Sequence, residues 1–373
     1  MSGAVVKEPR APFPYFGGKR NAAQMVWDAF GDPANYVEPF CGSCAMLLAR
    51  PASHIRKVET VNDKDGMLVN VWRAIRYAPD EVAHECAIPV MECELHARLA
   101  STKARMTPDF ISWVEGDERH YDAHLAANWI YCTCASIGSP LNEDGPWHVV
   151  NGMLVKSTGD AKNSIRRKLP HLGDAGQGVN RELPHLGDAG RGVNRELPHL
   201  GDAGRGVNRE LPHLGDAGQG VDYSKEDMVR QYLAALSRRL ERVRICCGDW
   251  RRIVKSDTTL FAGQNNSAVF LDPPYSTSPD LYAEGEDVTE QVRDWCIKNG
   301  GRKNVRIALC GYMADHDALL EHGWRKAKGK AGGSGMNKDR TNASKRERIW
   351  FSPYCSLPED LFDMLAKETE AAQ

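Results

Sequence analysis

Residues 270–275, which read Phe-Leu-Asp-Pro-Pro-Tyr, combine groups that suit a planar ring bearing an exocyclic amine. Pro273 and Pro274 cannot continue a central strand or a helix, so the chain breaks there and exposes its carbonyls. Asp272 and the Pro273 carbonyl can each accept one N–H of the amine, and Tyr275 can stack on the ring. A capping aspartate in a Pro-Pro loop is the alternative, and we favour the catalytic interpretation.

A glycine pair near the N-terminus is the first of two turns that can approach a ligand. Tyr15, Phe16, Gly17, Gly18 and Lys19 follow one another in the chain. Paired glycines let the backbone come close to a ligand, while a lysine and aromatic rings can hold a carboxylate and a flat ring. Taken alone, the pattern also occurs in ordinary turns, which is the blander interpretation.

The second turn contains Glu38, Pro39, Phe40 and Gly42. It lies between the end of an expected strand and the start of an expected helix. In open α/β sheets the ligand crevice is found at the carboxyl ends of the strands. The turn is therefore well placed to hold a cofactor.

Asn62 and Asp63 end the next expected strand. An acidic residue at this place can accept both ribose hydroxyls of an adenosine-containing cofactor. The alternative is that Asp63 is a solvated cap of the following helix. Because the turn with Gly42 lies upstream, we favour the ligand interpretation.

The elements that must position these residues alternate between strands and helices. Short apolar runs predict strands at residues 35–40, 57–61, 268–271 and 305–309. Apolar residues at helical spacing predict helices at 45–50, 66–77 and 227–243. This alternation predicts an α/β fold with a doubly wound sheet.

Residues 169–224 hold four near-identical 14-residue repeats, each beginning Leu-Pro-His-Leu-Gly-Asp-Ala-Gly. Every unit carries three glycines and one proline, which disfavours both a helix interior and a long strand. We expect a chain of turns inserted between two halves of a domain. The near-identity of the copies indicates duplication of one loop.

Composition restricts the class of protein. The formal net charge of −2 excludes a uniformly basic nucleic-acid binder. Contacts to DNA would have to come from local clusters such as residues 325–348, which hold nine Lys or Arg. No stretch approaches the ~18 uninterrupted apolar residues of a membrane helix, and residues 1–10 lack the apolar centre of a signal peptide. We expect a soluble, cytoplasmic protein with no membrane partner.

The 11 cysteines do not form a metal-binding pattern. Cys41 and Cys44 form one Cys-x-x-Cys pair, but no second pair accompanies it at the spacing of a zinc site. Reduced, buried thiols in a cytosolic chain are the expected state. The sequence therefore calls for no metal.

Five motifs occur in a distinctive order: FGGK at residues 16–19, EPFCG at 38–42, ND at 62–63, GDW at 248–250 and DPPY at 272–275. This order resembles that of the Dam-type adenine-N6 DNA methyltransferases, especially the phage-borne members. The resemblance covers residues 12–76 and 245–352. It implies a Rossmann-like fold, S-adenosylmethionine as cofactor and double-stranded DNA as substrate, with a cognate restriction nuclease as a candidate partner.

The resemblance also implies roles for single residues. The segment from Tyr15 to Lys19, together with the turn from Glu38 to Gly42, would surround the methionine part of the cofactor. Asp63 would take the ribose hydroxyls, and Asp249 would bond the adenine of the cofactor. Residues 306–312 resemble the strand that follows the DPPY motif, and residues 346–352 resemble the closing hairpin. Cys44 stands where the family usually has a second glycine, so its side chain would crowd the cofactor or widen the loop.

In such a protein a target-recognition region separates the early motifs from DPPY. We therefore expect a catalytic domain of residues 1–76 and 225–373, with residues 77–224 inserted as a largely irregular or helical recognition region that includes the repeats at 169–224. Aromatic and basic side chains in the insertion can contact bases and phosphates. The candidates are Trp113, Trp129, Tyr131, Trp147 and the group Arg166-Arg167-Lys168.

The reaction that the resemblance implies is direct attack of adenine N6 on the methyl group, without a covalent enzyme intermediate. The target base would have to leave the double helix first. Two other functions stay open: a methyltransferase acting on RNA or on a protein amide, and a catalytically silent DNA-binding protein. Asp272 argues against the first, because related enzymes of that kind mostly carry asparagine there. The intact DPPY motif argues against the second.

Overall fold

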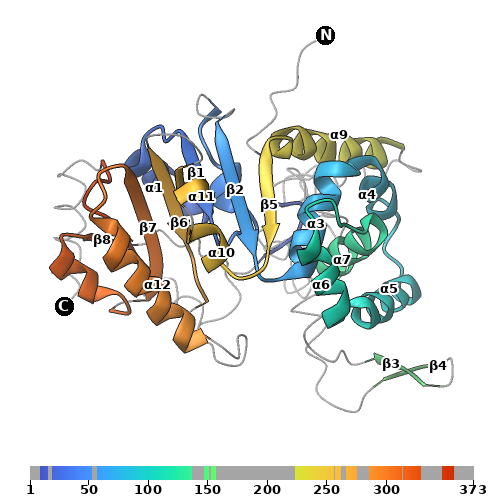
Figure 1. Ribbon diagram of the computed structural model, residues 1–373. Coiled ribbons are helices and arrows are strands. Elements are labelled where there is room, and N and C mark those ends of the chain that lie inside the picture. Colours follow the sequence, from blue (N-terminus) through green and yellow to red (C-terminus); the bar gives the residue numbers. More distant parts are fainter. Residues whose placement is uncertain are drawn as a thin grey trace, which may run out of the picture. The chain divides into compact units, whose positions relative to one another are not determined.

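The computed structural model describes residues 9–15, 19–52, 57–136, 147–150, 153–156, 223–255, 257–261, 266–274, 285–312, 314–328 and 347–356. Residues 169–222, which hold nearly all of the repeats, therefore lie outside the described residues. The chain divides into two compact units (Figure 1). The first comprises Met1–Phe16 and Asp65–Glu241, and the second comprises Gly17–Lys64 and Arg242–Gln373.

The second unit is built on a seven-stranded sheet in the order β5-β2-β1-β6-β7-β9-β8 (Figure 1). The strands are β1 Asn35–Glu38, β2 Val58–Asp63, β5 Val243–Cys247, β6 Ser267–Leu271, β7 Val305–Tyr312, β8 Arg325–Lys328 and β9 Glu347–Phe351. β5, β2, β1, β6 and β7 run parallel, whereas β9 pairs antiparallel with both β7 and β8. In chain order the parallel strands read 3-2-1-4-5, which is the start of the Rossmann order. The predicted Rossmann-like α/β sheet is confirmed at this level.

Several predicted boundaries of strands and helices differ from the observed ones. β1 stops at Glu38 rather than at residue 40, because Pro39 has no N–H for the ladder. β2 continues through Asn62 and Asp63, which pair with β5. The helix expected at 227–243 is α9 Tyr223–Leu240, since Val243 is already the buried first residue of β5. The helix expected at 45–50 is α2 Ala45–Leu48, and that at 66–77 is α3 Gly66–Tyr77.

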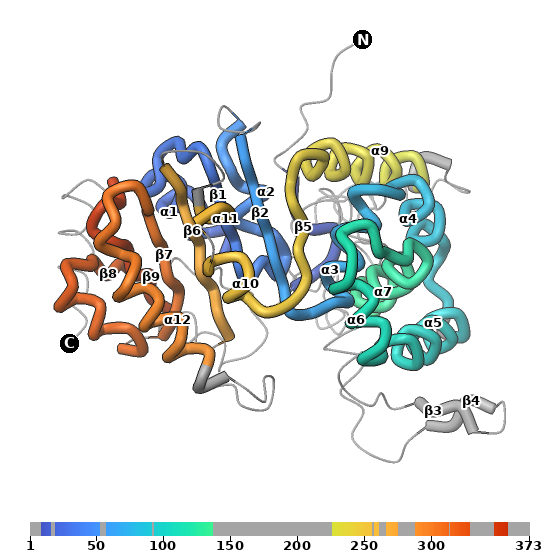
Figure 2. The backbone as a smooth tube through the Cα atoms, in the orientation of Figure 1, coloured from blue at the N-terminus to red at the C-terminus, as the bar shows by residue number. Residues whose placement is uncertain are grey.

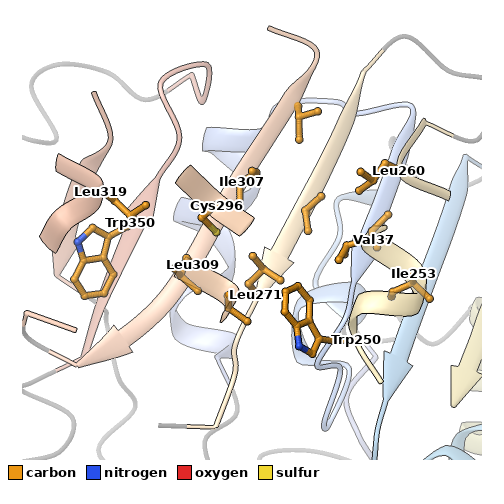
Figure 3. Close-up of a cluster of buried hydrophobic side chains, with 14 of the residues drawn as sticks. Val37, Trp250, Ile253, Leu260, Leu271, Cys296, Ile307, Leu309, Leu319 and Trp350 are labelled. Carbon is orange, nitrogen blue, oxygen red and sulfur yellow. The ribbon is translucent and has the colours of Figure 1, made fainter. Parts of the chain in front are cut away.

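One face of the sheet carries the larger apolar core. Side chains from alternate strand positions, including Val37, Leu271, Ile307 and Leu309, lie in one cluster (Figure 3). The cluster also takes in residues of α10 Arg251–Val254, α11 Asp257–Phe261 and α12 Gly285–Gly300. Full burial of each such aliphatic side chain contributes roughly 1.5–3 kcal/mol. These helices and strands therefore fix one another's positions.

The alternate positions of the same strands carry side chains that contact α1 Ala23–Phe30. Trp27 of α1 lies against Tyr36 of β1 with ring centroids 4.8 Å apart, and Phe30 lies 5.8 Å from Trp27. The Arg306 guanidinium of β7 donates to the Phe30 carbonyl. β6 is thus covered on both faces, and all five of its residues are buried. This explains why its sequence is a continuous apolar run.

The first unit is mainly helical (Figure 2). Besides α3 and α9 it contains α4 Pro79–Cys86, α5 Glu92–Arg105, α6 Pro108–Gly116 and α7 Ala123–Ala135. A two-stranded hairpin pairs β3 Trp147–Val150 with β4 Met153–Lys156. α7 packs against α3, α4 and α5, while α9 packs against α3 and α4.

Polar side chains help to set the geometry of these helices. Asp65 caps α3 by accepting from the amides of Met67 and Leu68. Arg73 of α3 donates to the carbonyls of Val114 and Asp117 at 2.6 and 2.8 Å. Such charge-assisted bonds hold the end of α6 on α3. None of the helices in the described part of the chain is long and apolar enough to cross a membrane.

A buried histidine closes the turn after β7. His316 is fully buried, and its ring lies edge-on to Trp350 with centroids 5.1 Å apart. A Cβ on Gly311 would come within 2.6 Å of the imidazole, so only glycine fits at this point of β7. Burial, with Arg293 nearby, lowers the pKa of His316 from 6.5 to about 4.

We predict that His316 weakens the fold as the pH falls from 6.5 towards 4. The lowered pKa means that the folded state prefers the neutral imidazole, so stability is complete above pH 6.5 and is lost below it. Between pH 7.5 and 5 this group should cost roughly 2 kcal/mol. The free energy of unfolding in urea, measured at both pH values, should fall by that much more in wild type than in His316→Gln. Equal pH dependence in the two proteins would contradict the prediction.

Candidate functional site

The acidic residues singled out from the sequence meet at one edge of the sheet. Glu38, Asp63, Asp249 and Asp272 lie at or just after the carboxyl ends of β1, β2, β5 and β6. The strand order reverses between β1 and β6, and ligands of open α/β sheets bind outside such a reversal. All four belong to the second unit. The topology thus brings these four residues to one edge of the sheet.

Asn62 connects the turns at this edge. Its side-chain amide donates to the carbonyls of Pro39 and Gly248 at 3.0 and 2.9 Å. The Asp63 carbonyl accepts from the Gly248 amide at 2.9 Å. Asn62 is almost fully buried, so these bonds form away from water. Sequence reasoning gave this residue no separate role, although a buried amide at a strand end was the available signal.

Asp63 shapes the turn after β1. Its Oδ2 accepts from the amide of Gly42 at 2.9 Å. The cap of the following helix is Asp65, so the alternative interpretation of Asp63 as that cap is wrong. The predicted bond from Asp63 to the ribose of a cofactor stays a prediction.

The turn from Gly42 to Cys44 has left-handed backbone at two positions. Gly42 has φ 47°, and Cys44 has φ 51° with ψ 27°. Cys44 alone among the described non-glycine residues has positive φ, and its side chain is fully buried. The amide of Cys44 donates to the Cys41 carbonyl at 2.7 Å, so the turn stays tight. The cysteine is thus accommodated without opening the loop. Its left-handed backbone is strained, however, whereas glycine adopts this conformation freely.

The thiol of Cys41 contacts the side chain of Cys44. This contact and burial raise the pKa of Cys41 well above its usual range. Both cysteines are free, as are the other nine. Within the described ranges no group of three or more His, Cys, Asp or Glu is arranged to hold a metal ion.

Glu38 is a buried carboxyl group. It is 2% exposed and accepts from the Tyr36 hydroxyl at 2.9 Å and the Leu47 amide at 3.2 Å. Burial raises its pKa from 4.5 to about 8; the two hydrogen bonds oppose this shift, and the charges of Asp272 and Asp63 add to it. A cation placed at this edge would favour the ionised form.

Lys19 joins Asp272 to a residue that the motifs did not include. Its Nζ lies 2.9 Å from Oδ2 of Asp272 and 3.1 Å from Oε1 of Glu347. Burial lowers the pKa of Lys19, but the neighbouring acidic groups, Asp272 foremost, outweigh burial and raise it overall. Lys19 is therefore a buried ammonium ion that contacts the aspartate of the DPPY motif. The prediction that it contacts the methionine part of a cofactor is not tested.

The start of the DPPY loop is held by α12. Pro273 is buried, and the Pro274 carbonyl accepts from the hydroxyl of Thr289 at 3.2 Å. Asp272 is partly buried. The loop therefore leaves β6 in one fixed direction up to Pro274. Tyr275 lies outside the described residues, as do Phe16, Gly17 and Gly18.

Asp249 forms a local ion pair. Its carboxylate accepts from the guanidinium of Arg251 at 2.8 Å through each oxygen, and Oδ1 also accepts from the Arg251 amide. These bonds lower the pKa of Asp249, with the Arg251 side chain as the main cause. Phe40 lies beside Trp250, with ring centroids 5.8 Å apart. The predicted contact between Asp249 and the adenine of a cofactor stays a prediction.

The aromatic residues expected in the recognition region divide into two kinds. Trp129 and Tyr131 are buried in α7, so their expected role as exposed base contacts does not fit; they fill the core of the helical unit. Trp113 is 41% exposed and stacks on His120 at 4.6 Å. Tyr15, which was predicted to lie at the cofactor and not in the recognition region, is also exposed and belongs to the first unit, with its ring 6.5 Å from that of Phe13. The side chain of Trp147 and residues 166–168 lie outside the described part.

The family model described as D12 class N6 adenine-specific DNA methyltransferase matches residues 15–94. The match includes Lys19, Glu38, Gly42 and Asp63 and ends before β5 and β6. No curated protein matches the chain. The edge of the sheet that carries these residues belongs to a Rossmann-like α/β fold, and the match covers its strands β1 and β2. Residues 15–94 are thus similar to the D12 class, and this similarity supports methylation of adenine N6 in DNA as the activity of the chain.

We predict that Glu38→Gln stabilises the protein increasingly as the pH rises. The raised pKa means that the folded state prefers the neutral acid, so wild type is most stable below pH 4.5 and loses stability as the pH approaches 8. Between pH 5 and 7.5 the advantage of the variant should grow by roughly 3 kcal/mol. Urea unfolding at the two pH values measures it. Glu321→Gln, which alters an exposed carboxylate, serves as the control, and an equal change in both variants would refute this account of Glu38.

We also predict that the fold tolerates glycine at Cys44 but not valine. Glycine relieves a left-handed conformation that costs about 1–2 kcal/mol, and this offsets the loss of one small buried side chain. Cys44→Gly should therefore lie within about 1 kcal/mol of wild type, whereas Cys44→Val should lose more than about 2 kcal/mol. Thermal unfolding tests both. Cys296→Gly is the matched control, because Cys296 is buried in the interior of α12 and should lose about 2 kcal/mol. Equal losses for the two glycine variants would count against a strained Cys44.

Proposed function

We propose that the enzyme transfers a methyl group from S-adenosylmethionine to N6 of an adenine flipped out of double-stranded DNA, with Asp272 and the Pro273 carbonyl as the groups that bind the amine. The observation that carries the proposal is the position of Asp272, directly after β6 at the strand-order reversal and held by Lys19 at 2.9 Å. A carboxylate fixed in this way can accept an N–H bond at a set direction.

The residues of this edge fit a cationic cofactor. Glu38 is a buried acid whose pKa lies near 8, and Asp63 and Asp272 are the further carboxylates that raise it. A ligand with positive charge would relieve the repulsion among the three groups. The left-handed turn at Gly42 brings backbone close to the same edge. When bound, S-adenosylmethionine supplies a methyl group on a sulfonium, which needs no metal for transfer.

The chain's own groups act on the adenine. Its N6 lone pair is delocalised into the ring, which makes the amine a weak nucleophile. Hydrogen bonds from N6 to Asp272 and to the Pro273 carbonyl favour a pyramidal nitrogen. Its lone pair then points out of the plane of the ring, where it can meet the methyl group. Holding the amine in line with the methyl group can remove roughly 7–11 kcal/mol of entropic barrier in good cases. Tyr275 would stack on the extruded base and offset part of the cost of unstacking.

We propose that the second unit carries this chemistry and that residues 77–224 include the target-recognition region. All the acidic residues of the candidate edge belong to the second unit, which supports the first part. Trp113 on α6 and the repeats at 169–224 are the features that motivate the second. A restriction nuclease as a partner stays a prediction.

The decisive test is transfer of labelled methyl from S-adenosylmethionine to unmethylated genomic DNA, followed by digestion to nucleosides. Wild type should produce N6-methyladenine, and Asp272→Ala should lower the rate at least about 100-fold, as loss of a directed polar contact in an active site does. Asp294→Ala changes an exposed aspartate on α12 and should act like wild type. Labelled RNA or protein in place of DNA, or full activity of Asp272→Ala, would overturn the proposal.

A further inference from the structure

Glu347 is the acidic residue at this edge that no motif includes. It is the first residue of β9 and pairs in register with Tyr312 at the end of β7. Because β9 runs antiparallel to β7, its start lies at the edge where the parallel strands end. β7 in turn pairs with β6, which precedes Asp272. A residue far from the DPPY motif in sequence is thus two strands away from it in the sheet.

Glu347 and Asp272 share one ammonium ion. The Nζ atom of Lys19 lies 2.9 Å from Oδ2 of Asp272 and 3.1 Å from Oε1 of Glu347. The side chains of the three residues are 7%, 19% and 15% exposed for Lys19, Asp272 and Glu347, so water screens the charges little. The lysine therefore distributes its hydrogen bonds between two carboxylates rather than serving one.

The shared ammonium affects the proposed reaction because Asp272 would also bind the target amine. The oxygen that contacts Lys19 belongs to the same carboxylate that would accept an N–H of the target adenine. A lysine bonded to Asp272 alone would compete for that carboxylate. Its positive charge would also oppose the positive charge that develops on N6 as the new N–C bond forms.

We propose that Glu347 is a positioning residue for methyl transfer: it shares the Lys19 ammonium with Asp272, which offsets the charge of the lysine and fixes the lysine that holds the aspartate carboxylate. A second carboxylate on Lys19 thereby reduces the opposition between its positive charge and the charge that develops on the adenine amine. The inference rests on the proposed role of Asp272.

The position of β9 does not depend on this side chain. Its backbone is paired with β7 on one side and β8 on the other, and Ile349, Trp350 and Phe351 are buried. Neutralising Glu347 should therefore leave the strand in place. This allows the electrostatic role to be tested apart from the fold.

The test compares Glu347→Gln with Glu347→Asp, using S-adenosylmethionine and duplex DNA that wild type methylates. The single-turnover rate at saturating substrates should fall about 10-fold or more in Glu347→Gln, while the KM values for cofactor and DNA stay within about 2-fold of wild type. Glu347→Asp keeps the charge and should recover most of the rate. Glu321→Gln is the control for loss of an acidic side chain elsewhere in the same unit and should behave as wild type.

Each other result has a definite meaning. A wild-type rate for Glu347→Gln, with Asp272→Ala inactive, would overturn the role of Glu347 and leave the proposed function intact. Equal loss in Glu347→Gln and Glu347→Asp, together with lower unfolding midpoints, would show that the residue serves the fold alone and would also overturn it. Full activity of Asp272→Ala would remove the basis of both proposals.

Discussion

The turns after β1 and β5 depend on one buried amide, that of Asn62. Its two N–H groups bond to the carbonyls of Pro39 and Gly248, which belong to turns separated by most of the chain. Both carbonyls lie where water has little access, so each would lose its partner if the amide were absent. Asp63 completes the arrangement, because its carboxylate accepts from the Gly42 amide and its carbonyl accepts from the Gly248 amide. Gly42, Asp63 and Asp249 lie in or beside these turns, so their placement depends on this amide.

Among the described residues at this edge of the sheet, acidic side chains outnumber basic ones. The charges of Asp272 and Asp63 contribute to the raised pKa of Glu38, and Lys19 is a buried cation that contacts Asp272. Burial is the main reason why the pKa of Glu38 is raised to about 8, and the neighbouring carboxylates add to this effect. Such an arrangement costs stability in the absence of a ligand and favours a cationic one. The chemistry proposed for the enzyme involves positive charge both on the methyl donor and on the methylated amine.

Much of the sheet could be predicted from the sequence, because a parallel strand buried on both faces must be a short apolar run, as in β6 and β7. The break at Pro273 and the turn at Gly42 followed from the limits of proline and glycine. Other features depend on tertiary contacts that no local pattern encodes. Glu347 meets Lys19 only because β9 inserts antiparallel beside β7, and Trp129 and Tyr131 turn inward because α7 is surrounded by α3, α4 and α5. The end of α9 was misplaced because Val243 continues the helical apolar spacing but belongs to β5.

Cys44, the left-handed residue in the turn after β1, shows what a side chain at such a position costs the fold. A side chain at such a backbone position raises the energy of a domain by only about 1–2 kcal/mol, whereas domains are typically stable by about 5–15 kcal/mol. A glycine chosen for its conformation can thus be replaced without loss of the fold when the remaining contacts are strong. Sequence patterns that require glycine at this site will overlook chains that have drifted in this way. The contacts of Asn62 and Asp63 differ in kind, because each needs a polar side chain and not merely a permissive backbone.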